Sequence, residues 1–247
     1  MFGSLGKFEV REGVLGVRRF LAGSTSWVSG GLTGAASVAG SVAVVIASIG
    51  TTTFDGAQEG VFKGGVDWVH DRVIDLGASP TVAGRTSGTV FMLISITIVA
   101  LIYFLGVRGM STVPGGPDRT ALWRGFGHVL IPIAFAYLLA HYFSLIYYQE
   151  QAQFTYLLSD PLGTGTTALF GTAGSGVDYP GLSNQLLWYI QVAALVGGHV
   201  AGLVLAHDRA ISYWGDYRLA ARSQYWMLAV MVAFTCFGLF LLSVSNA

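Results

Sequence analysis

The sequence predicts an all-α membrane protein: a polytopic transmembrane helix bundle of about five spans, with an amphipathic helix on its outer surface. Two observations predict this class. Apolar residues make up 53% of the 247 residues and charged residues only 11%, whereas a soluble domain normally has about 25% charged residues. The apolar residues also form continuous runs of about 20, which is the length that a helix needs to cross a bilayer. The strands of a membrane barrel would alternate instead.

Five runs without Lys, Arg, Asp or Glu define the domain organisation. The predicted spans are residues 34–54, 88–107, 125–148, 186–206 and 225–245. Residues 1–33 then form an N-terminal arm, and residues 34–247 form one transmembrane helical domain. The arm lacks the apolar core of a signal peptide, so the first span itself is expected to direct insertion. The single cysteine, Cys236, lies in the last span and excludes an intrachain disulfide.

Lys and Arg are concentrated on one side of the predicted bundle. Ten of them fall in the N-terminal arm and in the loops 108–124 and 207–224, and the other three fall in the loop 55–87. Loops rich in Lys and Arg stay in the cytoplasm. We therefore expect a multi-pass protein of the plasma membrane with its N-terminus in the cytoplasm and its C-terminus outside. The zero net charge gives no general attraction to nucleic acid, and no such partner is expected.

The two predicted outer loops differ in character. In the first, apolar residues recur at helical spacing and predict an amphipathic helix over residues 57–76, lying along the outer surface. The residues of this stripe are Phe62, Val66, Val69, Val73 and Leu76. The polar residues beside it, Asp67, His70, Asp71 and Asp75, are a candidate divalent-ion site, although a solvated polar face is the favoured interpretation. The second loop, 149–185, is rich in Gly, Pro, Ser and Thr, and its length predicts a lid or binding loop.

A polar stripe on the third span predicts a functional cavity. Tyr137, His141, Ser144 and Tyr148 are spaced i, i+4, i+7 and i+11 and share one helix face. Because polar side chains in a membrane avoid lipid, this face is expected to line a cavity, open to the outside, within the bundle. The fourth span adds polar residues at comparable depth, including a histidine within the small-residue pattern Gly198–Gly202. The predicted cavity lining is Tyr137, His141, Ser144, Gln149, Glu150, Gln191 and His199.

Histidines at these positions suggest a metal. Neutral imidazole is a common metal ligand, so His141 and His199 are the candidate ligands for a transition metal. The alternative is that the two histidines only tie helices together. Two haems are excluded because the histidine pairs on the two spans are separated by about 220° and about 80° around the helix axis, and a single haem has little support. No other cofactor is predicted.

Other histidines lie at the predicted inner membrane surface. We expect this group to anchor the helices at the interface rather than to act in catalysis. Its members are His128, His207, Asp208 and Arg209. The chain contains no HExxH, GxSxG or P-loop motif.

Several long blocks resemble one known family. They are TTTFDG (51–56), LIPIAFAYLLAHYFSLIYYQEQ (130–151), SDPLGTG (159–165), LFGTA (169–173), LWYIQVAALVGGHVAGLVLAHDRA (187–210) and RSQYWMLAVMVAFT (222–235). Together they resemble the C-terminal portion of multi-pass membrane proteins, common in actinobacteria, that carry the label fenitrothion hydrolase. Members of that family are usually longer, with further spans before the matching segment. The resemblance therefore implies either a shorter variant or a membrane partner that supplies the missing half.

The family also implies an activity and a set of positions. Its label implies hydrolysis of organophosphate esters. Its recurring residues correspond here to His141, Gln149, Ser159, Asp160, His199, His207, Asp208 and Arg209. A hydrolase would require a metal or an activated water, for which His141, His199, Glu150 and Asp160 are the candidate suppliers.

Three functions stay open from the sequence. The leading hypothesis is an integral membrane protein whose cavity handles a metal ion or a small solute, or which serves as a subunit of a membrane complex. The alternatives are a membrane-bound phosphoester hydrolase and a purely structural membrane subunit. The expected partners are the lipid bilayer and either a second copy of the chain or another membrane polypeptide.

Overall fold

A computed structural model of the chain describes residues 40–160 and 181–245, and these residues form helices and no strand. The elements are α2 (Ser41–Ala57), α3 (Lys63–Asp75), α4 (Pro80–Met110), α5 (Arg119–Phe126), the 3₁₀ helix η1 (Gly127–Val129), α6 (Leu130–Ser159), α7 (Asn184–Trp214) and α8 (Tyr217–Ser245). The all-α fold class predicted from the sequence is therefore confirmed.

Four segments of the described chain are long and apolar enough to cross a membrane. They are Pro80–Met110, Arg119–Phe154, Asn184–Trp214 and Tyr217–Leu241. This chain is an integral membrane protein. The first predicted span, 34–54, is represented by α2, which has 17 residues and is shorter than the roughly 20 that a span requires. Residues 34–39 of that predicted span lie outside the described part.

Polar residues fix the helix boundaries in the connections. The Ser79 side chain accepts from the Val82 N–H at the start of α4, Asp118 caps α5 at Ala121, and Ser183 caps α7 at Leu186. Such caps satisfy backbone N–H groups that have no partner within the helix. The α7 helix ends at Gly215, whose positive φ of 64° is a conformation that glycine adopts without the steric cost of a Cβ. The chain can therefore turn directly into α8.

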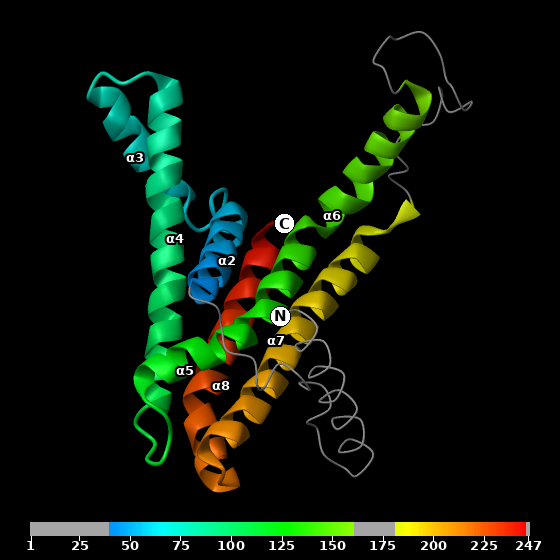
Figure 1. Ribbon diagram of the computed structural model, residues 1–247. Coiled ribbons are helices and arrows are strands. Elements are labelled where there is room, and N and C mark those ends of the chain that lie inside the picture. Colours follow the sequence, from blue (N-terminus) through cyan, green and yellow to red (C-terminus); the bar gives the residue numbers. More distant parts are fainter. Residues whose placement is uncertain (1–39, 161–180, 246–247) are drawn as a thin grey trace, which may run out of the picture.

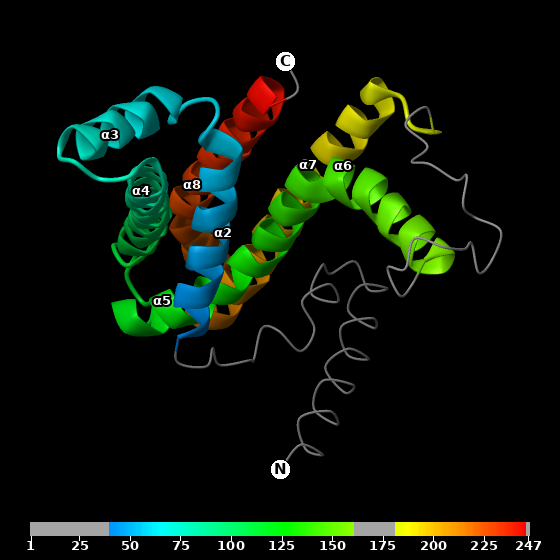
Figure 2. The ribbon, with the colours of Figure 1, turned by 90° about the horizontal axis from the view of Figure 1, so that it is seen from above.

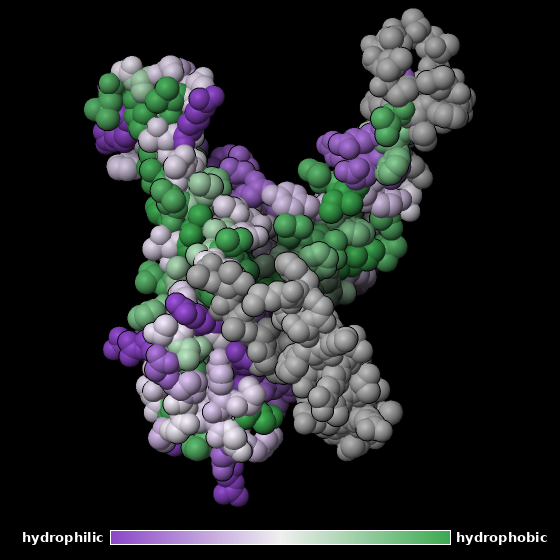
Figure 3. Space-filling model, viewed as in Figure 1, coloured by the Kyte–Doolittle hydropathy of each residue, from purple (hydrophilic) through white to green (hydrophobic). Residues whose placement is uncertain are grey.

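The long helices converge at one end of the molecule and separate at the other (Figures 1 and 2). We call the end that carries α3 and the C-terminal end of α6 the α3 end, and the opposite end, with α5 and the α7–α8 connection, the α5 end. In Figure 1, α4 with α3 diverges from α6 and α7 toward the α3 end, and α2 lies between them. The space-filling view shows the molecule hollowed there, with hydrophilic atoms over the end of α2 (Figure 3).

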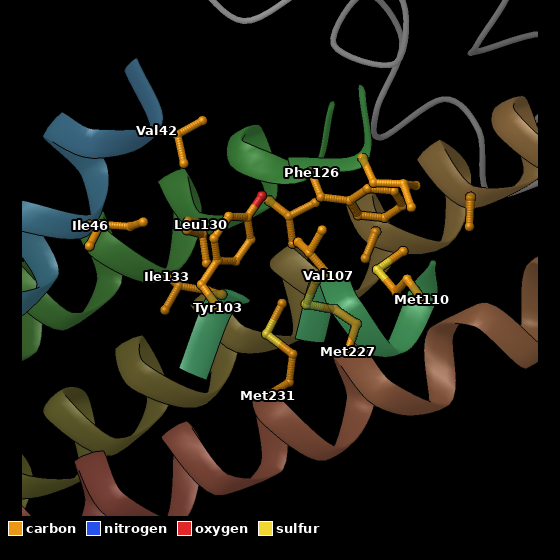
Figure 4. Close-up of a cluster of buried hydrophobic side chains, with 14 of the residues drawn as sticks. Val42, Ile46, Tyr103, Val107, Met110, Phe126, Leu130, Ile133, Met227 and Met231 are labelled. Carbon is orange, nitrogen blue, oxygen red and sulfur yellow. The ribbon is translucent and has the colours of Figure 1, made fainter. Parts of the chain in front are cut away.

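The main apolar core lies toward the α5 end. Tyr103, Val107 and Met110 of α4 pack with Phe126 and Met227 from α5 and α8, and all five are almost fully buried (Figure 4). The Tyr103 hydroxyl donates to the Trp123 carbonyl oxygen at 2.7 Å, which satisfies the one polar group of that side chain. Among membrane helices such close packing supplies the association energy, because lipid is as apolar as the core.

The small-residue pattern of α7 joins it to α6. A Cβ on Gly198 would lie 2.1 Å from the Ala136 Cβ and 2.8 Å from the Pro132 carbonyl oxygen, and a Cβ on Gly202 would lie 3.0 Å from the Val129 carbonyl oxygen. The absence of side chains thus lets the two backbones approach closely. The Gly198–Gly202 face is covered by this chain's own α6, so it gives no reason to expect another polypeptide there.

The amphipathic helix predicted over residues 57–76 is present in shorter form as α3, Lys63–Asp75. Its apolar stripe is half-buried from Phe62 to Val73, and the Phe62 ring packs on Phe91 of α4 with the ring centroids 5.6 Å apart. Leu76 departs from the stripe and is 87% exposed because α3 ends at Asp75. The helix therefore rests on the first turns of α4 at the α3 end (Figure 2).

Candidate functional site

Asp55 lies in the last turn of α2 and is the centre of a polar cluster between membrane helices. Its Oδ2 accepts from the Tyr142 hydroxyl at 2.8 Å and lies 3.0 Å from the His141 Nε2. Its Oδ1 accepts from the Gln58 side-chain amide at 3.1 Å. A charged side chain among membrane helices is costly unless it is paired, and here both carboxylate oxygens have donors.

Two adjacent residues of α6 provide the partners of this carboxylate. The rings of His141 and Tyr142 meet edge to face with their centroids 4.7 Å apart, which orients both polar atoms toward Asp55. The side chain of Asp55 is 40% exposed and that of His141 is 21% exposed. Water at the α3 end can therefore reach the cluster, in the region where hydrophilic atoms gather at the end of α2 (Figure 3).

The geometry assigns different tasks to the two ring nitrogens of His141. A carboxylate only accepts hydrogen bonds, so Nε2 carries the proton that is donated to Asp55. The other nitrogen, Nδ1, lies 3.5 Å from the position that a Cβ on Gly56 would occupy, and the Tyr137 hydroxyl lies 3.4 Å from that same position. Gly56 therefore leaves space between His141 Nδ1 and the Tyr137 hydroxyl.

That space belongs to a pair of small adjoining cavities between α2, α6, α7 and α8. The first, which we call the outer cavity, is lined by Gly56, Tyr137 and His141, among others. The second, which we call the inner cavity, is lined by Thr53, Tyr137 and His199 together with apolar side chains. Each has room for about one water molecule. Both cavities are bordered by Tyr137, Leu195 and Gly238, so Tyr137 stands at their junction.

His199 borders the inner cavity from α7. It is 6% exposed, and its Nδ1 lies 2.8 Å from the Leu195 carbonyl oxygen. A carbonyl oxygen accepts, so Nδ1 carries the proton and the neutral ring presents an unprotonated Nε2. This Nε2 is buried without a hydrogen-bond partner. The Tyr137 hydroxyl, which lies beside Thr53, likewise has no hydrogen bond of regular geometry.

The structure brings together three of the seven predicted lining residues: Tyr137, His141 and His199 border the two cavities. Gln191 is buried on α7, 3% exposed, but does not border either cavity. Ser144 is half-buried, and Gln149 and Glu150 are exposed farther along α6. These four residues do not line the cavities that contain the histidines.

The described residues contain no group of three His, Cys, Asp or Glu side chains that could hold a metal ion. His141 and His199 border different cavities, so the structure does not present them as a joint ligand pair. The acidic set of α3 is exposed, with the His70 Nδ1 3.4 Å from the Asp71 carboxylate. This arrangement agrees with a solvated polar face.

The four predicted interface anchors differ in burial. Asp208 and Arg209 are 7% and 8% exposed, and the Arg209 guanidinium donates to the Tyr213 hydroxyl at 2.9 Å. The His207 ring packs edge-on against Tyr217, and His128 lies half-buried in η1. Arg209 is thus integrated into the packing between helices at the α5 end.

Sequence reasoning assigned Asp55 to an outer loop and did not single out Tyr142. Asp55 directly follows the apolar run that ends at Phe54, so it could be taken for the first loop residue, whereas α2 continues to Ala57. Tyr142 lies beside His141 and off the predicted polar stripe. The signal that could have found Asp55 is an acid within one turn of an apolar segment, since such acids tend to have a specific partner.

Comparison of the chain with protein-family models, with curated proteins and with solved structures found no match in any of the three.

Proposed function

We propose that this membrane protein binds and releases protons at the Asp55–His141 pair, as part of moving an ion or a small solute across the membrane. The observation that carries the proposal is the 3.0 Å contact between His141 Nε2 and Asp55 Oδ2, with Tyr142 on the same oxygen. Ionisable pairs among membrane helices are rare and typically mark ion or proton pathways.

The surroundings support proton binding in particular. The titratable groups that face the pair are Tyr137 and Tyr142 from α6, while α8 contributes only Gly238 and Leu241 to the adjoining cavity. A proton needs only the two partners present, whereas a bound transition metal commonly needs three or four protein ligands. Metal binding by His141 and His199 therefore has weaker support.

The charge distribution supports a location for the site. Ten Lys and Arg residues flank the α5 end in sequence and three flank the α3 end. With the positive side in the cytoplasm, the Asp55–His141 pair faces the outside of the plasma membrane.

Infrared difference spectroscopy of the protein in nanodiscs, between acidic and neutral pH, tests the proposal. We expect a carboxyl band that disappears in Asp55→Asn and shifts in His141→Gln. Asp67→Asn, at an exposed acid on α3, is the matched control and should leave that band in place. A spectrum unchanged by Asp55→Asn contradicts the proposal. Zn²⁺ or Cu²⁺ binding that is lost in both His141→Ala and His199→Ala would favour a metal site instead.

A second candidate, the phosphoester hydrolase, is favoured by one feature of the same pair. A carboxylate that orients a histidine, whose second nitrogen faces a small cavity, is the arrangement of a general base that activates water. The resemblance to the fenitrothion hydrolase family points to the same activity. Release of nitrophenol from an aryl phosphotriester, lost in His141→Gln and retained in Asp67→Asn, would support it. No turnover above that of empty nanodiscs would exclude this substrate class.

We also propose, from the resemblance alone, that the chain associates with a membrane partner, either a second copy or another polypeptide. The measurement is the mass of the protein component in a detergent-solubilised sample, by light scattering. A single chain of 26.2 kDa would contradict an association that survives detergent.

A further inference from the structure

We propose that Tyr137 connects His141 to His199 through two bound water molecules, so that protons entering at Asp55 reach a second histidine deeper among the helices. This inference rests on the proposed proton-binding function and extends it to His199. It is carried by three groups, His141, Tyr137 and His199, that border two adjoining cavities in succession.

The unpartnered atoms point to water in these cavities. Buried polar atoms in proteins have a hydrogen-bond partner in the great majority of cases, and ordered water often supplies it. His199 Nε2 has no hydrogen-bond partner and the Tyr137 hydroxyl, beside Thr53, has none of regular geometry, and both residues border the inner cavity. The hydroxyl can donate and the bare Nε2 can accept, so one water molecule between them satisfies both.

The outer cavity provides the corresponding link to His141. A Cβ on Gly56 would lie within ordinary contact of the Tyr137 hydroxyl, at 3.4 Å, and of His141 Nδ1, at 3.5 Å. A water molecule in the space beside Gly56 would meet both polar atoms. The hydroxyl of Tyr137 can accept on this side while it donates on the other.

The proton balance along this chain is simple. When the doubly protonated His141 ring releases the proton on Nδ1 to the outer water, that water passes a proton to the Tyr137 oxygen. Tyr137 releases its own hydroxyl proton to the inner water, which passes one to His199 Nε2. His141 loses one proton, His199 gains one, and Tyr137 and both waters end as they began, with no electron transferred.

Two substitutions interrupt the chain at different points without removing a histidine. Tyr137→Phe deletes only the hydroxyl at the junction. Gly56→Ala places a methyl group between His141 and Tyr137 at contact distances that cause no clash. The matched control is Gly84→Ala on α4, where a Cβ would meet no atom within 4 Å. Circular dichroism and gel filtration confirm that each variant is folded.

The experiment is nitrogen-15 NMR of histidine-labelled protein in nanodiscs, with the His199 signal assigned through His199→Gln. We expect Tyr137→Phe to shift the His199 Nε2 resonance, because the donor to that nitrogen is lost. We expect Gly56→Ala to slow proton exchange between solvent water and the His199 ring, because the outer link is blocked while the inner water remains, and Gly84→Ala to change neither signal. A His199 signal unchanged by both variants overturns the connection.

The same set of variants separates this inference from the proposed function. If Asp55→Asn removes the carboxyl band but His199 does not respond to Tyr137→Phe, the connection fails and the proton site at Asp55 stands. If His199 responds while Asp55→Asn has no spectral effect, the water-linked chain stands and the proton site at Asp55 fails.

Discussion

At the scale of single residues, Asp55 determines the chemistry of the site because three side chains donate to its two oxygens. The polar stripe of the third span placed Tyr137 and His141 on one helix face, since helical periodicity fixes which residues share a face, and both border the small cavities described above. Periodicity within one helix cannot show which residue of another helix meets that face. For that reason the sequence predicted the histidine and missed its carboxylate partner.

Asp55→Ala should destabilise the protein. The change leaves the donors of His141 and Tyr142 without their acceptor, which costs about 1–3 kcal/mol for groups that are fully buried. Because the Asp55 side chain is 40% exposed, water replaces part of the lost bonding, and we expect a loss near 1 kcal/mol. The loss of stability is measured as a decrease in the midpoint of thermal unfolding in detergent. Asp67→Ala on the exposed face of α3 should change the midpoint little, and an equal effect of both variants would argue against the cluster as a stabilising contact.

His199→Leu distinguishes a functional histidine from one that only ties helices together. No protein group bonds the ring nitrogen Nε2, and the Leu195 carbonyl oxygen that accepts from Nδ1 lies within the helix α7. An apolar side chain of similar volume is therefore expected to cost little stability. We expect at most a small decrease in the thermal unfolding midpoint, together with loss of any proton-dependent activity. A clear decrease in the midpoint with activity retained would show that His199 is a structural tie.

At the scale of elements, the sequence located the apolar runs well and their ends poorly. The predicted span 88–107 corresponds to α4, Pro80–Met110, because helical hydrogen bonding continues beyond the apolar stretch until a cap such as Ser79 stops it. Likewise, the Gly198–Gly202 pattern predicted a close helix contact but not its partner. Small residues on one helix indicate that the backbone of another segment packs closely against it. Only the fold shows that this segment is α6.

Gly198→Ala should separate α6 from α7. Its Cβ would lie 2.1 Å from the Ala136 Cβ and 2.8 Å from a backbone oxygen of α6, so the helices must move apart at a cost of about 1–3 kcal/mol. The neighbouring variant Gly197→Ala is the control, since its Cβ would meet no atom within 4 Å and alanine favours a helix over glycine by up to about 1 kcal/mol. The stability of the two variants is compared by the concentration of denaturing detergent at which each one unfolds. Equal stability of the two variants would contradict the observed α6–α7 contact.

At the scale of the whole molecule, dense packing toward the α5 end and separation of the helices toward the α3 end place the polar site where the bundle opens (Figures 1 and 3). The helix α4 has 31 residues and is roughly 46 Å long, which exceeds the hydrocarbon thickness of about 30 Å. It must therefore tilt or extend beyond the hydrocarbon. The sequence predicted the class of protein, because hydropathy is a local property. It could not predict the hollow, which depends on the angles between helices.

The orientation of the molecule in the membrane determines which compartment supplies protons to the Asp55–His141 pair. The native Cys236 is first replaced by alanine, because it is exposed on α8 and would react as well. In that background, Asp67→Cys reports on the α3 end and Thr120→Cys on the α5 end, and both positions are exposed. Because Lys and Arg flank the α5 end in sequence, a membrane-impermeant thiol reagent should label only position 67 in intact cells. After the membrane is permeabilised, both positions should react. Labelling of position 120 alone in intact cells would reverse the orientation, and the Asp55–His141 pair would then draw its protons from the cytoplasm.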